Sequence, residues 1–533
     1  MARACTLLTG LAMTIVSLTL GAMTLGISPP ARAAQDAARI LTYSWPSNAG
    51  PLDPQGYGAN QMYAQAMLYE PLVRYRADGT IAPWLATAWQ ISADGKRYTF
   101  TLRDDVTFSD GTPFDAAAVK ANIVAVLANR KHHDWLELVA QIDRAEVVDE
   151  HTVRLVLKHA YYPTLQELAL IRPLRFASPK VLEADGHVSA PVGTGPWQLA
   201  ESRRGEFDLF TRNPHYWGPK PAYEAVKVKV IGDANTRAIA LQTGQIDLVQ
   251  GADGQISADT FERFKASGQF KTAVSPPLAT RVLTLNSKRA PTRDLAVRQA
   301  IEHAIDKDSI VAKLLYGLEP RADTLFAPSF PYADLGLAPY RYDPVEAERL
   351  LEADGWMRGA DGIRHKDGQP LEIGFYFVGS DAQQKAIAEV VQAELKRVGI
   401  DVRLAGEEAN SISARQKSGE FGMVFSETWG APYDPHSYVS SMRAPSHADY
   451  QAQLGLPMKA KLDREIGEVL TSTDEDTRQA LYRDILTTLH QQAVYVPISY
   501  ITAISVSRPG VAGVGFGATI NEIPFEQMHP ATP

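Results

Sequence analysis

The chain has 533 residues, of which 45% are hydrophobic and 21% charged, and its formal net charge is -8 at pH 7. The charges are spread along the chain without long acidic or basic blocks. This balance argues against a nucleic acid or an anionic membrane surface as the partner. A chain of this length exceeds what one hydrophobic core usually supports, so we expect two or three lobes.

The N-terminal segment has the layout of a secretory signal. A basic start precedes a long apolar run, and the small-residue site Ala31-Arg32-Ala33 follows. We expect residues 1–33 to be the signal peptide, although a run of this length also permits an uncleaved membrane anchor. The single cysteine, Cys5, lies within it and too early for a lipoprotein site. The mature chain is therefore expected in the periplasm of a Gram-negative cell, without disulfides or thiolate metal sites.

The first third of the chain contains strand patterns with one clear helix between them. Tyr98 to Leu102 and Thr152 to Leu157 alternate apolar and polar residues, as half-exposed strands do. The helix is predicted to follow Asp115, with Val119, Ile123, Val126 and Leu127 on its buried face. The sequence therefore predicts a β-rich insertion in this region.

The second half contains a strand-helix-strand unit. Leu371 to Phe377 alternates as a strand, and Ser380 or Asp381 is placed to cap a helix that Gly399 ends. Asp401 to Leu404 follows as the next strand, so we expect a parallel sheet. Another helix is expected to start at Asp343-Pro344 and to stop at Gly355.

The segment from Thr428 to Tyr450 is unusually rich in residues that bind ligands. It holds one Trp, three Tyr, two His, two Asp, one Arg and one Met. Gly430, Pro432, Pro435 and Pro445 interrupt it, so the sequence predicts a long ordered loop without helix or strand. Ordered loops of this length are usually functional, and we expect a ligand here.

The common catalytic signatures are not found. The sequence has no GxSxG elbow, no HExxH zinc motif and no Walker A loop. The run Gly513 to Ala518 spells GxGxxA, but too few residues follow it for a dinucleotide-binding unit. We therefore expect no enzyme, with a secreted metal-dependent hydrolase as the distant alternative.

Several motifs spread over nearly the whole chain resemble the signature of the peptide and nickel class of ABC-transporter solute-binding proteins. They are the segments Trp84 to Trp89, Ser92 to Lys96, Thr99 to Ala116, Gly193 to Trp197, Arg212-Asn213 with Tyr216-Trp217, Gly244 to Asp247 and Tyr342 to Pro344. The resemblance implies an α/β fold of two lobes, the large form with an extra β-rich subdomain. Its hinge would be two strand crossings, and the lobes would close on one ligand.

The resemblance also implies the division of the chain. Lobe I would hold residues 34–281 plus 503–533, including the β-rich insertion, and lobe II would hold residues 282–502. The crossings are expected near Val282 to Asn286 and Pro497 to Ser505. A protein of this class would be a monomer that delivers its ligand to an ABC permease in the inner membrane.

Three segments are more similar to the nickel-binding members of the class: Tyr57 with Asn60-Gln61-Met62, Gln166 to Phe176, and Thr428 to Gln453. Such proteins hold Ni²⁺ as a chelate with a small organic metallophore, such as histidine. The residues agree with this, because no cluster in the sequence could supply the four to six nitrogen and oxygen ligands that nickel takes. Alternatives within the same fold are a dipeptide, an oligopeptide, another metal chelate such as cobalt, or haem.

The resemblance assigns roles to individual positions. His447 matches the direct nickel ligand, and the alternative is a loop histidine bonded to Asp449 or Ser446. Arg172 matches the arginine that pairs with a chelator carboxylate, which suits a planar guanidinium; the alternative is a structural arginine. Trp135, Trp429 and Tyr433 match the aromatic walls, which exclude water, although each could be ordinary core.

Weaker matches complete the expected site. Met62 matches a thioether that faces the metal at a distance, and Tyr57 lies by the same mouth, although Met62 could simply fill space. Asn521 is a further candidate that could equally be a turn residue.

One position departs from the family pattern. His132 stands where a second carboxylate-pairing arginine is usual, and an imidazole is largely neutral at pH 7. We expect His132 to favour a chelator less acidic than a tricarboxylate, for example a bis-histidine nickel complex, or to approach the metal itself. The alternative is a solvated helix end.

Overall fold

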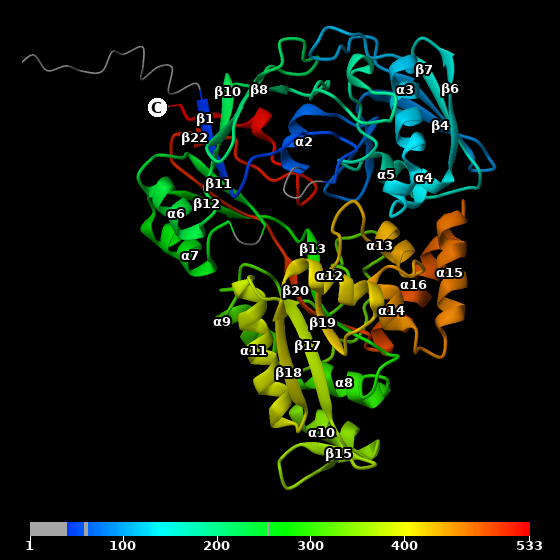
Figure 1. Ribbon diagram of the computed structural model, residues 1–533, viewed down its shortest axis with the longest axis vertical. Coiled ribbons are helices and arrows are strands. Elements are labelled where there is room, and N and C mark those ends of the chain that lie inside the picture. Colours follow the sequence, from blue (N-terminus) through cyan, green and yellow to red (C-terminus); the bar gives the residue numbers. More distant parts are fainter. Residues whose placement is uncertain (1–39, 58–61, 253–254, 533) are drawn as a thin grey trace, which may run out of the picture. The chain divides into compact units, whose positions relative to one another are not determined.

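The computed structural model describes residues 40–57, 62–252 and 255–532 (Figure 1). The expected signal peptide and the motif positions Asn60 and Gln61 lie outside these ranges. In the part of the chain that the structure describes, no helix is long and apolar enough to cross a membrane.

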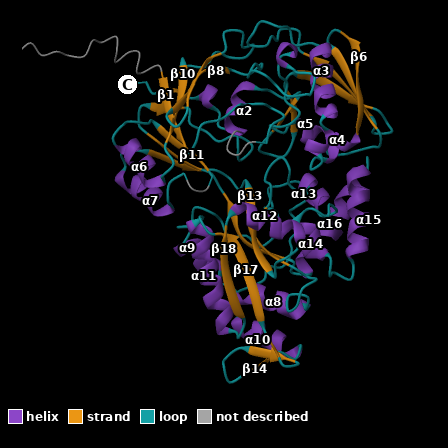
Figure 2. Ribbon diagram, in the orientation of Figure 1, coloured by secondary structure: helices purple, strands orange, loops and turns teal. Residues whose placement is uncertain are grey.

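A seven-stranded mixed sheet, in the order β12-β21-β11-β1-β10-β9-β8, includes β1, the first strand of the described chain. Its strands are β1 (Ile40–Trp45), β8 (Trp197–Arg203), β9 (Phe207–Arg212), β10 (Ala225–Val230), β11 (Leu248–Gly251), β12 (Lys271–Val274) and β21 (Ile504–Ser507). Figure 2 shows β1 beside β10. The parts of the chain that form these strands also form three helices, α2 (Met62–Leu68), α6 (Ala234–Gln242) and α7 (Ala258–Ser267). Tyr43, Phe210 and Val226 are fully buried in the core that this sheet forms.

A five-stranded sheet, in the order β18-β17-β19-β13-β20, contains the predicted strand-helix-strand unit. Its strands are β13 (Ala279–Leu285), β17 (Glu372–Val378), β18 (Asp401–Glu407), β19 (Met423–Glu427) and β20 (Tyr495–Ile501). Strands β17 and β18 pair in parallel, and Asp381 caps α11 (Ala382–Arg397) by accepting from two backbone N–H groups. The prediction for this unit is confirmed. The same half of the chain also forms the helices α8 (Leu295–Ala304), α9 (Lys307–Lys313), α10 (Pro344–Ala353) and α12 (Ala409–Ser418).

The chain changes from one sheet to the other at residues 275–278 and again at 502–503. These two segments are bonded to each other, because Ser275 N–H donates to the Ala503 carbonyl at 2.9 Å and Ala503 N–H donates to Ser275 Oγ at 2.8 Å. The first change comes before Val282 to Asn286, which lie in and just after β13.

The β-rich insertion forms a four-stranded antiparallel sheet in the order β4-β5-β7-β6. Its strands are β4 (Ala86–Ile91), β5 (Arg97–Leu102), β6 (Ile142–Asp149) and β7 (Thr152–Leu157). Helix α3 (Ala116–Ala128) is capped by Asp115, as predicted, and contacts β6 and β7. The helices that follow are η1 (Arg130–His133), α4 (Glu137–Gln141), α5 (Thr164–Leu168) and η2 (Pro179–Val181).

The prediction that Thr428 to Tyr450 contains no helix is wrong at two places. Helix α13 spans His436–Ser441 and α14 spans Ala448–Gln453. Pro435 is the N-cap residue of α13, where a missing N–H costs nothing, and Pro445 lies between the two helices. The prolines therefore separate short helices instead of preventing them.

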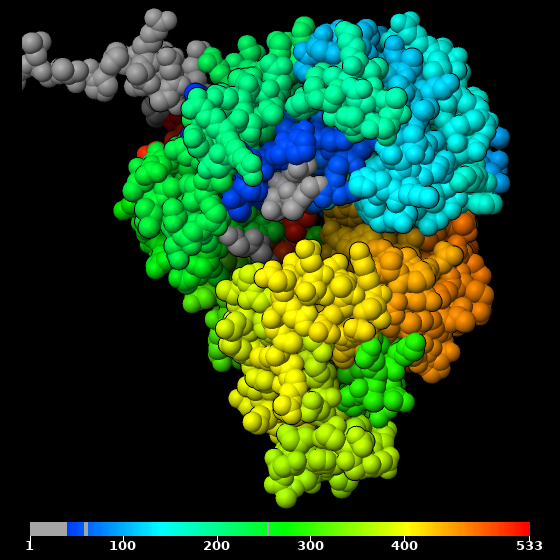
Figure 3. All heavy atoms as spheres, in the orientation of Figure 1, coloured from blue at the N-terminus to red at the C-terminus, as the bar shows by residue number. Residues whose placement is uncertain are grey.

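One hydrophobic cluster connects the β-rich insertion with the helices that follow α14. It runs from Phe100 and Leu155 to Ile466 on α15 (Lys459–Thr471) and Tyr482 on α16 (Glu475–Gln491). Figure 3 shows the two regions in contact, as the cyan and orange surfaces. Short strands and one helical turn complete the described chain: β2 (Val73–Tyr75), β3 (Ile81–Pro83), β14 (Met357–Arg358), β15 (Arg364–Lys366), β16 (Gln369–Pro370), β22 (Val511–Ala512), η3 (Phe525–Gln527) and β23 (His529–Pro530).

Candidate functional site

Aromatic and imidazole rings from three distant segments meet in one place. We call them the ring cluster: Tyr57, His132, Trp135, Trp429, Tyr433 and His447. Trp135 joins the segments, because its ring centroid lies 5.7 Å from that of Tyr57, 6.3 Å from Trp429 and 6.2 Å from Tyr433. His447 lies beyond Trp429, at a centroid distance of 5.6 Å. The structure therefore brings together most of the residues that the sequence proposes for the site.

The turn after α3 presents two adjacent histidines to different surroundings. Asn129 ends α3, and the chain then makes the short helix η1. Successive residues of a helix point in different directions, so His132 is exposed while the side chain of His133 is completely buried. The ring of His132 lies 4.9 Å from that of Tyr57.

Arg172 lies at the Tyr57 side of the ring cluster. Its guanidinium carbon is 5.0 Å from the centre of the Tyr57 ring, and its Nη1 donates to the Gly56 carbonyl at 3.3 Å. Burial lowers the pKa of Arg172, but a guanidinium remains charged at physiological pH. The side chain can therefore offer a permanent positive charge beside an aromatic face.

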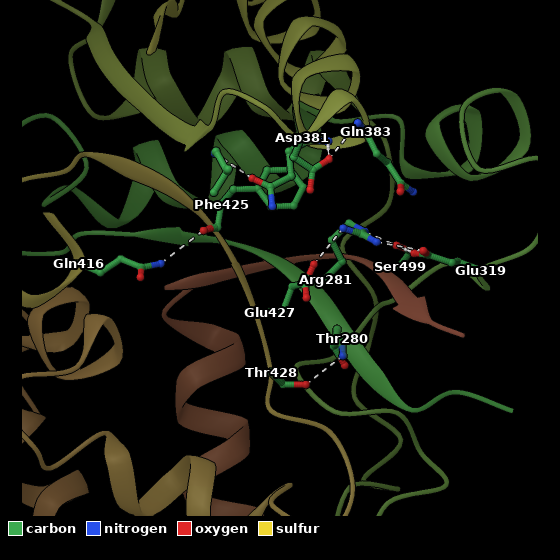
Figure 4. A network of polar contacts seen from close by, with 12 residues as sticks. Thr280, Arg281, Glu319, Asp381, Gln383, Gln416, Phe425, Glu427, Thr428 and Ser499 are labelled. Carbon is green, nitrogen blue, oxygen red and sulfur yellow. Dashed lines mark hydrogen bonds and ion pairs between the residues drawn. The ribbon is translucent and has the colours of Figure 1, made fainter. Parts of the chain in front are cut away.

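The segment that carries Trp429 and Tyr433 is tied to the crossing strand β13. Thr428 and Thr280 exchange two hydrogen bonds of 2.9 Å, one through the Thr428 hydroxyl (Figure 4). Asp434 accepts from Gly430 N–H at 3.0 Å, and Gly430 has the positive φ of 76° that a residue with a side chain rarely adopts. The two ring residues are thus held on a turn that is fixed at both ends.

His447 is the N-cap residue of α14 and is half-buried. Burial lowers the pKa of His447 below its usual value, so the imidazole is neutral at pH 7. A neutral imidazole has one lone pair to offer, which is what a metal ligand requires.

The other polar side chains of the segment bond within the protein. His436 is buried and its Nδ1 lies 2.9 Å from the Tyr482 hydroxyl, while Asp449 accepts from the Tyr438 and Tyr495 hydroxyls at 2.7 and 2.9 Å. Burial raises the pKa of Asp434 to about 7. These contacts hold α13 and α14 against the core.

Met62 and Asn521 are placed less tightly than the other candidates. Met62 is the first residue of α2 and is half-buried, and Asn521 lies in a turn before η3. Within the described residues, no hydrogen bond or ring contact joins either side chain to the ring cluster.

Two polar contacts between distant segments were not expected from the sequence. The Ser437 hydroxyl, on α13, donates to the buried Glu167 carboxylate of α5 at 2.8 Å, and Tyr161 donates to the same oxygen at 2.6 Å. The hydroxyls of Tyr162 and Tyr332 are bonded at 2.9 Å. No local pattern marks the pairs Ser437 with Glu167 and Tyr162 with Tyr332, because the partners are 270 and 170 positions apart in the sequence.

Comparison with known proteins agrees with this architecture. The family model described as "Bacterial extracellular solute-binding proteins, family 5 Middle" matches residues 80–450. The nickel-binding periplasmic protein of Escherichia coli (strain K12) is 53% identical over 497 residues, which are 92% of this chain and 95% of the relative.

Solved structures give the same result. NikA from Brucella suis, in complex with Fe(III)-EDTA, superposes with a TM-score of 0.91 and 60% identity, covering 92% of this chain and all of that one. An ABC transporter substrate-binding protein from Sinorhizobium meliloti superposes with a TM-score of 0.76 and 32% identity, over 92% of this chain and 100% of the other. The predicted two-lobed α/β fold is confirmed. The chain belongs to family 5 of the bacterial extracellular solute-binding proteins.

Proposed function

We propose that this protein captures nickel in the periplasm as a complex with a small organic chelator and delivers it to an ABC importer. The observation that carries the proposal is the ring cluster, in which a neutral histidine and aromatic walls from distant segments meet beside Arg172. The names of two of the relatives above, a nickel-binding protein and a protein in complex with an iron chelate, support it.

The donor chemistry favours a chelate over a bare ion. Among the described residues, no group of three or more His, Cys, Asp and Glu side chains is placed to hold a metal. His447 could supply one nitrogen, so the remaining ligands of a Ni²⁺ ion would come from the chelator.

Arg172 and the ring cluster would hold the chelator itself. A carboxylate of the chelate would pair with the guanidinium of Arg172, and Trp135, Trp429 and Tyr433 would exclude water from that pair, which strengthens it. His132 is exposed beside Tyr57 and offers no permanent charge, which supports a preference for a chelate less acidic than a tricarboxylate. Met62, Tyr57 and Asn521 complete the proposed set.

Isothermal titration tests the proposal directly. We expect the purified mature protein to bind nickel with L-histidine more tightly than Fe(III)-EDTA, and either chelate more tightly than nickel chloride alone. His447→Gln should weaken the nickel complex, whereas His187→Gln, a change at an exposed histidine paired with Asp185, should not. Binding of short peptides or haem, with neither chelate bound, would contradict the proposal and favour the other ligands of this fold.

The proposed function also includes export of the protein and a role without catalysis. The family and its periplasmic relative support a binding protein that works with a membrane permease. We propose that it acts as a monomer and turns over no substrate. We propose that residues 1–33 are removed on export, and that lobe I (34–281 plus 503–533) and lobe II (282–502) close on the chelate. Mass spectrometry under native conditions, on protein from the periplasm, would give the mature N-terminus and any retained metal complex together.

A further inference from the structure

Of the two adjacent histidines in η1, the buried one has the closer polar contact with the site. His133 Nδ1 and the Tyr57 hydroxyl oxygen are 2.6 Å apart, which is a short hydrogen bond. His132, in contrast, contacts Tyr57 only ring to ring among the described residues.

Tyr57, which His133 contacts, in turn contacts Arg172. The guanidinium carbon of Arg172 lies over the Tyr57 ring at 5.0 Å, and the carbonyl of the preceding residue, Gly56, accepts from Arg172 at 3.3 Å. The direction of the guanidinium therefore depends on where Tyr57 and its backbone lie. An arginine can pair with a carboxylate through two parallel hydrogen bonds only when its plane is oriented correctly.

The burial of His133 is otherwise unfavourable. The side chain is fully buried, and its Nε2 has no hydrogen-bond partner among the described residues. Burial also lowers the pKa of His133 to about 4, so the ring is neutral at pH 7. A buried polar group with half of its capacity unused costs free energy that an apolar residue of similar size would not. The contact with Tyr57 is the visible gain that offsets this cost.

We propose that His133 is a positioning residue of the chelate site, which fixes the Tyr57 ring through the hydroxyl and so orients Arg172 toward the carboxylate of the ligand. The inference rests on the proposed function and deepens it. The histidine that acts on the ligand from η1 is then the buried one, acting through Tyr57.

Two polar substitutions of His133, by asparagine and by glutamine, distinguish a side chain that positions Tyr57 through a hydrogen bond from one that only fills space. The amide of an asparagine reaches the place of Nδ1 in a histidine, and the amide of a glutamine reaches the place of Nε2. His133→Asn should keep the affinity for Fe(III)-EDTA and for nickel with L-histidine within about threefold. His133→Gln and His133→Leu should each weaken both by roughly tenfold, the usual size of one hydrogen bond.

A double-mutant cycle with Tyr57→Phe identifies the route of the effect. In the Tyr57→Phe protein the hydroxyl is absent, so His133→Gln should change the affinity by no more than about twofold. Melting curves monitored by circular dichroism would show that each variant is folded. If His133→Leu does not fold, the Asn and Gln variants alone decide.

Three results would overturn the inference: equal affinities of the Asn and Gln variants, unchanged affinity of the Gln variant, or the same loss with and without the Tyr57 hydroxyl. Wild-type protein that binds neither chelate would overturn the proposed function, and the inference with it. Wild-type binding with no difference among the variants would overturn the inference alone.

Discussion

Arg172 brings a permanent charge to the edge of the ring cluster, and the type of cation matters there. A guanidinium offers two parallel donors to a carboxylate, whereas an ammonium is a single charge without a plane. Binding at the proposed site would therefore depend on the geometry of Arg172 as well as on its charge.

Arg172→Lys is expected to weaken the binding of nickel with L-histidine although the charge is kept. One charge-assisted hydrogen bond is lost, so the affinity should fall by about 1.5–3 kcal/mol in isothermal titration. Arg349→Lys is the control, because Arg349 pairs with Glu346 on the exposed face of α10 and should leave binding unchanged. Equal binding by wild type and Arg172→Lys would remove Arg172 from contact with the ligand.

At this scale the sequence predicts most of the residues that the structure brings together in the ring cluster, but not the contact of His133 with Tyr57. The family resemblance points to Arg172, Trp135 and His447 because short motifs carry them. It points to His132 as the replacement for an arginine, and the burial of His133 depends on how η1 packs against Tyr57. A pair of identical neighbours gives no local signal that distinguishes the inner residue from the outer one.

Strand β13 links the segment from Thr428 to Tyr450 to the place where the chain crosses between sheets. It carries Thr280, which bonds Thr428, and Arg281, which is almost completely buried. Arg281 contacts Glu319 and Glu427 at 3.0 Å each, and the Ser499 hydroxyl of β20 donates to Glu319 (Figure 4). This network lies where the pairing of β13 with β20 shifts register.

Arg281→Met is expected to destabilise the protein strongly. Removal of one partner leaves the buried carboxylate of Glu319 without its main countercharge, which costs about 3–5 kcal/mol in other buried pairs. Urea denaturation would measure the loss. The double variant Arg281→Met/Glu319→Leu should recover most of it, because no buried charge then remains, and a double variant as unstable as the single one would contradict this explanation.

At the scale of elements, local signals were sufficient for long helices and insufficient for short ones. Asp115 and Asp381 cap α3 and α11 as their positions in the sequence predict. Helices α13 and α14 have six residues each, too few to form alone, and their packing against the core stabilises them. The prolines at their borders led the sequence pattern to predict a loop without helices.

The whole molecule depends on contacts between segments from both halves of the chain. Ser437 on α13 and Glu167 on α5 are bonded although 270 positions separate them. If these two segments lie in different lobes, a contact of this kind would favour the closed form, and a ligand held by both lobes would favour it further.

Ser437→Ala should therefore loosen the protein without removing a residue of the ring cluster. It deletes the hydroxyl that reaches Glu167, while Tyr161 and the Leu138 N–H still donate to the carboxylate. We expect a weaker affinity for the chelate, by about 1 kcal/mol, and a larger radius of gyration of the unliganded protein in X-ray scattering. Ser440→Ala, on the same helix, is the control. An unchanged radius together with an unchanged affinity would contradict the prediction.

Glu167 also makes stability depend on pH. Burial raises the pKa of Glu167 from 4.5 to about 7. Between pH 4.5 and about pH 7, Glu167 is therefore protonated in the folded protein but ionised in the unfolded chain. Its contribution to the free energy of unfolding is complete below pH 4.5 and is lost as the pH rises through 7.

Glu167→Gln should remove this fall of the free energy of unfolding with rising pH. The free energy of unfolding of the variant, relative to wild type, should rise by up to about 3 kcal/mol between pH 4.5 and pH 8, measured by urea denaturation at several pH values. Asp434, which has the same direction of shift, stays in both proteins and cancels in the difference. A difference that is constant with pH would show that Glu167 is ionised throughout.

The sequence by itself determined the family, the strand-helix-strand unit and most of the candidate site. Caps, periodicities and motifs are local, so a few neighbouring residues are sufficient to specify them. Only the tertiary structure decided which histidine of η1 is buried, which helices form between the prolines, and that Glu167 meets Ser437. Each of these depends on packing between segments that are far apart in the chain, where burial and the partners available replace local preference.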